Sequence, residues 1–157
     1  MVGRYFDEAV PYIRVGTDYF KKVKKIDRFG IWRTELKSWT KDEIKQDNGA
    51  AYINNIPKFD DFGIYPDNFN YQPVVENCYN LYKEFTHRPK EGSFYWSDVL
   101  MHHIFGEQYN LGLRYLQALY LNPDRSLPIL VLVSRERQTG KTTFLNWLNM
   151  IFGDNMV

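Results

Sequence analysis

Three consecutive segments near the end of the sequence constrain the fold more than any other feature. Residues 129–133 are five apolar residues without alternation, which is typical of a strand buried on both faces of a parallel sheet. A polar loop with the sequence Gly-Lys-Thr follows at 134–143. In residues 144–152 the apolar side chains recur at helical spacing, and Gly153 is suited to end that helix. This order predicts the first strand and helix of an α/β domain with a phosphate-binding loop.

The loop contains the residue types that are needed to bind a nucleoside triphosphate. A triphosphate carries about four negative charges, and the N–H groups at a helix N-terminus attract anions. Gly140 lets the backbone approach the phosphates, Lys141 reaches the β- and γ-phosphates, and the Thr142 hydroxyl binds Mg²⁺. ATP and Mg²⁺ are therefore the expected ligands. The residues expected to hold the phosphates are Arg137, Gln138, Thr139, Gly140, Lys141, Thr142 and Thr143. The alternative is a chance Gly-Lys-Thr at a helix start, with Lys141 merely solvated.

One position departs from the phosphate-binding pattern. Arg135 stands where the pattern Gly-x4-Gly-Lys-Thr has its first glycine. That glycine makes the tight turn out of the strand, so the loop must leave the strand differently or strain the backbone at Arg135.

The first part of the chain is rich in strand signals. Two β-rich runs, 12–15 and 19–23, flank a turn and predict a hairpin, and 31–36 predicts a third strand. Thr40 and Glu43 form a capping box for a short helix that Asn48-Gly49 ends. The breaker-rich stretch 57–68 predicts a surface connection between two units.

Helical spacing predicts two helices in the middle of the chain. The first covers 97–105, with Ser97 able to cap it and Gly106 able to stop it, and the second covers 107–121. The expected fold is α+β. It consists of a small β-rich unit at 1–63, a helical segment at 64–126 and the start of the α/β domain at 127–157.

Composition excludes several classes of protein. The net charge of +1 excludes a strongly basic nucleic-acid binder, so contact with nucleic acid requires a local patch. A single cysteine, Cys78, excludes a disulfide within the chain and a cysteine zinc cluster. The charged N-terminus lacks a signal-peptide pattern, and no apolar run approaches the roughly 20 residues that span a bilayer. We expect a cytoplasmic location, in a bacterium or encoded by a phage, and no membrane partner.

Other polar clusters suggest further hypotheses. A basic run beside Tyr19 and Phe20 could bind the phosphate backbone of a nucleic acid. Its residues are Lys21, Lys22, Lys24, Lys25 and Arg28. A solvated hairpin face is the alternative for this run. His102 and His103 point in different directions on a helix and are not expected to bind a metal, and Asp60-Asp61 is expected in a surface loop.

The loop and its surroundings resemble a known family. Residues 131–145, which run from Val131 to Leu145, look like the ATPase start of superfamily-three-type helicases, specifically the primase-associated helicases of bacteriophages and mobile elements, relatives of the poxvirus primase-helicase. The segments around Asn80-Leu81-Tyr82, His102–Gly106 and Leu113–Leu116 are similar to the helical segment before that core. The resemblance covers roughly residues 64–157, and the loop is its specific part.

The resemblance implies an ATP-dependent replicative DNA helicase that works as a homo-hexamer and binds ATP between its subunits. It also implies 3′-to-5′ movement on single-stranded DNA and a primase as partner. Hydrolysis also requires an acidic residue on a second strand and an arginine from a neighbouring subunit, and neither follows Thr142. The chain is therefore expected to be the front part of such a helicase and inactive alone. The alternative is a non-catalytic module that docks DNA or protein, in which the loop is a remnant of truncation.

Overall fold

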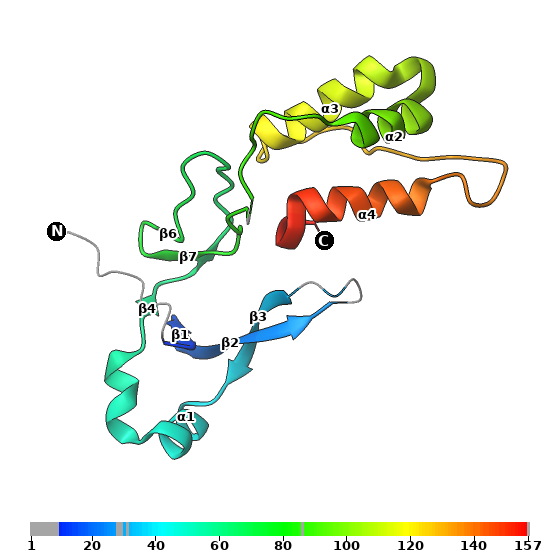
Figure 1. The fold of residues 1–157 in the computed structure, drawn as a ribbon. Helices are drawn as coiled ribbons and strands as arrows, with labels where there is room; N and C mark the ends of the chain where they lie inside the picture. The colour runs from blue at the N-terminus through cyan, green and yellow to red at the C-terminus, as the bar shows by residue number, and fades with distance from the viewer. Residues whose placement is uncertain (1–9, 28–29, 31, 86, 157) are drawn as a thin grey trace. The chain divides into compact units, whose positions relative to one another are not determined.

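The computed structural model describes residues 10–27, 30, 32–85 and 87–156 (Figure 1). The chain forms two compact units. Unit 1 contains the residues up to Tyr65 together with Gln72–Leu81, and unit 2 contains Pro66–Tyr71 and the residues from Tyr82 onwards. Each unit is described by itself below.

The larger sheet of unit 1 has four strands in the order β3-β2-β1-β4. Strands β1 (Tyr12–Val15) and β2 (Asp18–Ile26) form an antiparallel hairpin through a turn at Gly16, whose φ of 55° suits a glycine. Strand β3 (Trp32–Trp39) pairs with β2 from Tyr19 to Ile26. Strand β4 (Lys58–Phe59) adds a short parallel pair to β1. The predicted hairpin and third strand are confirmed.

Helix α1 (Lys41–Asn48) begins at the predicted capping box. The Thr40 hydroxyl accepts a hydrogen bond from the Glu43 N–H, and the Glu43 carboxylate accepts one from the Thr40 N–H. The helix ends at Gly49, where φ is 87°, and a 3₁₀ helix over Ala50–Asn55 follows. The predicted start and stop of this helix are confirmed.

A second, smaller sheet of unit 1 has the order β5-β7-β6. Strands β6 (Val74–Val75) and β7 (Cys78–Asn80) form a hairpin, and β5 (Phe62–Gly63) pairs in parallel with β7. The prediction of a surface connection between two units at 57–68 is confirmed in part, because the chain passes from unit 1 to unit 2 after Tyr65, but the same stretch also contributes β4 and β5. Tertiary pairing of strands only two residues long overrides the local turn signals.

Unit 1 buries its apolar side chains in two clusters. The first covers one face of the larger sheet with α1 and the 3₁₀ helix, and its buried members are Tyr12, Tyr19, Ile44 and Ile56. The second joins the other face to the smaller sheet, and its buried members are Ile13, Val15, Phe59 and Tyr79. The period-two alternation of β1 explains why adjacent residues enter different clusters.

Unit 2 contains three longer helices, α2 (Tyr95–Phe105), α3 (Tyr109–Leu121) and α4 (Lys141–Phe152). Gly106 ends α2 as predicted, but Ser97 does not cap it. Helix α2 begins two residues earlier, and the Ser97 hydroxyl instead accepts a hydrogen bond of 3.1 Å from the Trp147 indole. Met101, Phe144 and Leu148 form the buried core where α2 and α4 meet.

The strand predicted at 129–133 is not formed. The segment is extended but contains no assigned strand, and no backbone-to-backbone hydrogen bond joins it to any other described residue. Leu130 and Leu132 pack against the core of unit 2, whereas Ile129, Val131 and Val133 are 90%, 70% and 85% exposed. The prediction of a strand buried on both faces is wrong here, because the described chain supplies no neighbouring strand to pair with it.

The described structure is α+β, with small sheets in unit 1 and helices in both units. A complete α/β phosphate-binding domain is not present among the described residues. None of the helices that the structure describes is both long enough and apolar enough to cross a membrane.

Candidate nucleotide-binding site

The predicted phosphate-binding loop leads directly into α4. Gly140 precedes the helix with a left-handed φ of 79°, and its carbonyl accepts the first helical hydrogen bond, from the Phe144 N–H at 2.9 Å. No described side chain caps this helix end. The first N–H groups of an α-helix have no partner within the helix, so α4 offers its positive end to the loop.

The ammonium of Lys141 is hydrogen-bonded to two hydroxyls of the loop. Lys141 Nζ donates to Thr139 Oγ1 at 2.8 Å and also to Ser134 Oγ, and Thr139 Oγ1 donates to Ser134 Oγ at 2.9 Å. Within the described part of the chain, no carboxylate forms an ion pair with Lys141. A polyanion can therefore recruit this charge without breaking a salt bridge.

The backbone of the loop turns at Gln138 and Gly140. Gln138 has a φ of 59°, in a region that side chains other than glycine rarely adopt. Arg135, which replaces the first glycine of the motif, is not among the described residues with positive φ. The sequence left two possibilities: a different exit of the loop from the preceding segment, or backbone strain at Arg135. The structure has the different exit. The strained conformation lies three residues later than the motif would place it.

His103 of α2 contacts the loop from outside the motif. Its Nε2 donates a hydrogen bond of 3.3 Å to the Thr139 carbonyl. A Cβ at Gly140 would lie 3.2 Å from two atoms of the same imidazole. Gly140 thus meets two requirements at once, a positive φ and the close approach of His103.

The neighbouring His102 has different contacts. Its ring stacks on Tyr109 at 3.7 Å, and its Nε2 lies 3.9 Å from the Asp98 carboxylate. Tyr109 donates its hydroxyl to the same carboxylate, which raises the pKa of Tyr109 above its ordinary value. The two histidines therefore have separate roles, and only His103 belongs to the candidate site.

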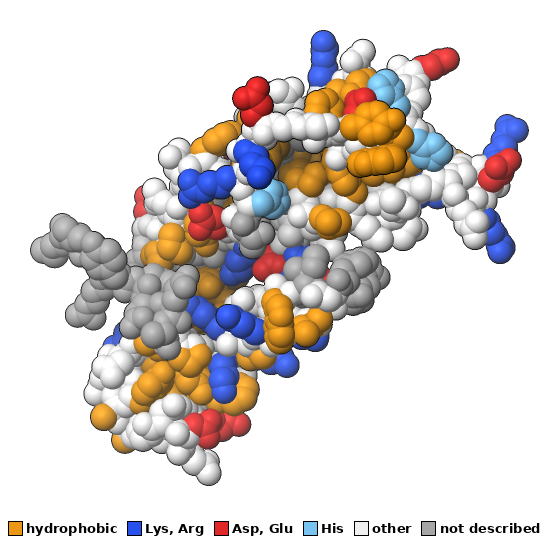
Figure 2. All heavy atoms as spheres, viewed as in Figure 1, with side chains coloured by type: hydrophobic (Ala, Val, Ile, Leu, Met, Phe, Trp, Pro, Cys, Tyr) orange, Lys and Arg blue, Asp and Glu red, His pale blue; other side chains and the backbone are white. Residues whose placement is uncertain are grey.

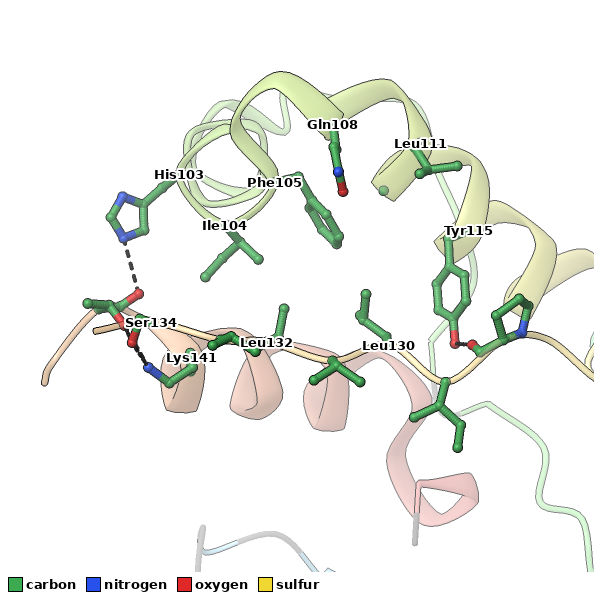
Figure 3. Close-up of a pocket in the computed structure, with 16 residues that line it drawn as sticks. His103, Ile104, Phe105, Gln108, Leu111, Tyr115, Leu130, Leu132, Ser134 and Lys141 are labelled. Carbon is green, nitrogen blue, oxygen red and sulfur yellow. Dashed lines mark hydrogen bonds between the residues drawn. The ribbon is translucent and has the colours of Figure 1, made fainter. Parts of the chain in front are cut away.

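A cavity of about 480 Å³ opens beside the loop (Figure 3). Its loop end contains Ser134 and Lys141, with His103 above them. Farther along, Phe105 of α2 and Leu130 and Leu132 of the extended segment point into the space between them (Figure 3). The cavity thus combines a polar, cationic end with an apolar body, which is the usual arrangement of a small-molecule site.

The structure brings some of the predicted residues together and leaves others in solvent. Thr139, Gly140 and Lys141 are half-buried and meet at the helix start. The predicted residues that are exposed around the loop are Arg137, Gln138, Thr142 and Thr143. Ser134 and His103 also lie at this site, and neither is among the residues predicted from the sequence to bind phosphate. Ser134 could have been found as the first polar residue after the apolar run, but nothing in the sequence indicates that α2 touches the loop.

The predicted basic run lies in unit 1 and is divided by the pleat of β2. The pairing register puts Lys21 and Lys25 on one face of the sheet and Lys22 and Lys24 on the other. Arg28 lies outside the described residues. Tyr19 is buried and Phe20 packs against the second core cluster, so neither ring of the pair that adjoins the run is available for stacking.

Comparison with protein-family models, with curated proteins and with solved structures found no match to this chain.

Proposed function

We propose that the loop at 134–143 binds the phosphates of ATP together with Mg²⁺. The observation that supports this most directly is the meeting of an uncapped helix N-terminus with the Lys141 ammonium and two loop hydroxyls. Backbone N–H donors, a lysine and a hydroxyl are the groups that phosphate-binding loops use. Thr142 is the residue proposed to bind Mg²⁺, since its hydroxyl is exposed in the first turn of α4.

The wider role that we propose is that of the front part of an ATP-dependent replicative DNA helicase. This proposal rests on the resemblance of 131–145 to primase-associated helicases of phages and mobile elements. It includes assembly into a homo-hexamer, translocation along single-stranded DNA and a primase as partner. Hydrolysis needs a carboxylate to hold Mg²⁺ and orient water, and no Asp or Glu is among the described residues that line the cavity beside the loop. The chain by itself is therefore proposed to bind ATP without turning it over.

The experiment is a titration of the whole chain with a fluorescent ATP analogue in the presence and absence of Mg²⁺. Replacing Lys141 by Ala should weaken binding about tenfold or more, because charge-assisted hydrogen bonds to the phosphates are lost. Lys90→Ala is the matched control, since Lys90 is an exposed lysine outside the loop. Equal affinities of the two variants would refute the phosphate role of the loop, and steady phosphate release that Lys141→Ala abolishes would refute the proposed lack of turnover.

A second candidate function is a docking module, and the extended segment at 129–133 favours it. An extended apolar segment with no backbone partner among the described residues is suited to pairing with a strand from another chain. A chain that binds no ATP analogue but self-associates, and loses the association in Val131→Lys, would favour this function over the first. Sedimentation velocity measures the association.

A further inference from the structure

The cavity beside the candidate phosphate loop divides into a cationic end and an apolar body. Lys141 and Ser134 lie at the loop end, and side chains of α2, α3 and the extended segment 129–133 line the body (Figure 3). Figure 2 shows a similar contrast at the surface of unit 2, with Lys and Arg side chains at the tip of the loop before α4 and hydrophobic side chains gathered over α2. A ligand that fills the whole cavity therefore combines an anionic part with an apolar part.

The ring of Phe105 forms a fixed wall of the apolar body. A Cβ at Gly112 of α3 would lie 2.5 Å from this ring, so the lack of a side chain there lets the ring lie directly on α3. The ring also packs edge-to-face on Phe144 in the core of unit 2, with 5.5 Å between the ring centres. An aromatic wall that is held by two helices is suited to pack against a planar base.

Gln108 brings hydrogen-bonding groups to this apolar body. It is the last residue of the 3₁₀ turn Gly106–Gln108, which joins α2 to α3, and its exposed side chain points from that turn toward the extended segment (Figure 3). Tyr115 is the other polar side chain of the body, and its hydroxyl already donates to the Pro128 carbonyl at 2.9 Å. No described residue forms a hydrogen bond with the Gln108 amide, so its carbonyl and its NH₂ group are both available to a ligand.

We propose that the body of this cavity binds the base of the nucleotide and that the Gln108 amide selects adenine. The inference rests on the binding of a triphosphate by the loop, as proposed above. Four extended residues separate Leu130 from Ser134, a span of roughly 13 Å. This span leaves room for a ribose between a base beside Leu130 and phosphates at the loop.

The amide of Gln108 is complementary to one edge of adenine. Its carbonyl accepts from the N6 amino group, and its NH₂ group donates to N7. Guanine presents two acceptors at the same edge, O6 and N7, so the Gln108 carbonyl would face a lone pair there. A bidentate pair of this kind discriminates between bases by a factor of about five or more.

The test is a competition titration of the whole chain in the presence of Mg²⁺. Unlabelled ATP, GTP, CTP, UTP and inorganic tripolyphosphate each displace an ATP analogue that is labelled on its ribose. ATP should bind at least about fivefold more tightly than the other three nucleotides. Tripolyphosphate has no base, so its affinity measures the loop alone. Gln108→Ala should weaken ATP by about the same factor and leave tripolyphosphate unchanged, which also shows that the variant is folded.

Gln108→Glu tests the hydrogen-bonding role directly, because a carboxylate only accepts hydrogen bonds. Guanine has two neighbouring donors, N1–H and the N2 amino group, whereas adenine has no edge with two donors. GTP should therefore bind more tightly than ATP to Gln108→Glu. The matched control is Gln117→Glu, which adds the same charge at an exposed position of α3 that does not line the cavity, and it should keep the preference for ATP.

The outcomes distinguish this inference from the proposed function of the loop. Equal affinities of the four nucleotides in the unchanged chain, or tighter binding of ATP than of GTP in Gln108→Glu, would overturn the role of Gln108. The loop proposal would survive either result if Lys141→Ala still weakens the binding of tripolyphosphate. If neither tripolyphosphate nor any nucleotide binds, the loop proposal fails and this inference fails with it.

Discussion

The imidazole Nε2 of His103 lies 3.3 Å from the carbonyl oxygen of Thr139, so α2 holds the candidate phosphate loop at the point where it enters α4. The hydrogen bond fixes the Thr139 carbonyl, and the Thr139 hydroxyl in turn accepts from Lys141. Helix α2 is thereby coupled to the one lysine of the loop through two consecutive contacts.

Replacing His103 by Ala should weaken binding of the ATP analogue several-fold, because the loop loses the contact that orders it before the ligand arrives. His103→Gln should retain more of the affinity, since its amide can still donate to the carbonyl. The matched control is His102→Ala, which removes the adjacent ring that stacks on Tyr109 instead. Titration of the three variants under one set of conditions provides the measurement. Equal losses in the two alanine variants would mean that His103 has no particular role in the loop.

Gly140→Ala should destabilise unit 2 by about 1–3 kcal/mol, because the position combines a positive φ with a Cβ placed 3.2 Å from His103. Gly92→Ala is the control, as an added Cβ there meets nothing within 4 Å. Thermal unfolding followed by circular dichroism compares the two. Combining Gly140→Ala with His103→Ala should recover part of the loss, since the crowding is removed and only the backbone strain remains. Additive effects in the double variant would exclude crowding by the imidazole.

Asn80→Asp should destabilise unit 1 by about 2–4 kcal/mol, although the side chain keeps its shape. Asn80 is 1% exposed, and its amide donates to the carbonyls of Tyr65 and Gln72 at 2.9 Å each. A carboxylate cannot donate these bonds and faces two carbonyl oxygens instead. Asn55→Asp, at an exposed position, should change little. Chemical denaturation of both variants measures the difference, and similar midpoints would contradict the role given to Asn80.

The capping box of α1 should make a pH-dependent contribution to stability. Hydrogen bonds from the Thr40 hydroxyl and then from the Thr40 N–H lower the pKa of Glu43 below its ordinary value of 4.5. A lowered pKa in the folded chain means that the contribution is fully present above pH 4.5 and is lost as the pH falls through the folded value. The melting temperature of Glu43→Gln should therefore lie below that of the unchanged chain at pH 7 and approach it near pH 3. A constant difference across this range would contradict the assignment.

Local signals predicted the parts of the structure whose stability is local. The hairpin of β1 and β2 and the helix that begins at Thr40 follow from alternation, turn residues and a capping box, all within a few residues of one another. The candidate phosphate loop was predicted in the same way, because its residues are consecutive, and its binding of phosphates stays a prediction. Glycines that stop helices, such as Gly106 and Gly153, were also recognised correctly, since each has a positive φ that the helix end requires.

The features that the sequence did not predict depend on distant partners. The smaller sheet of unit 1 is made of strands two or three residues long, too short for a period to appear. Its hairpin turns at Glu76 and Asn77, which both have positive φ although neither is a glycine. Residues 129–133 have the composition of a buried strand but lack a partner among the described residues. The contact of His103 with the loop joins positions 36 residues apart.

The path of the chain between the two units determines how the protein can be divided. It passes from one unit to the other three times, after Tyr65, after Tyr71 and after Leu81. A fragment that ends at Tyr65 would lack β7, to which β5 is paired, and also Asn80, whose side chain holds the backbone of Tyr65. Such a fragment should be recovered in poor yield or as aggregate, whereas one that continues through Leu81 retains every strand of both sheets. Expression trials that aim to isolate the first unit should therefore place the boundary after residue 81.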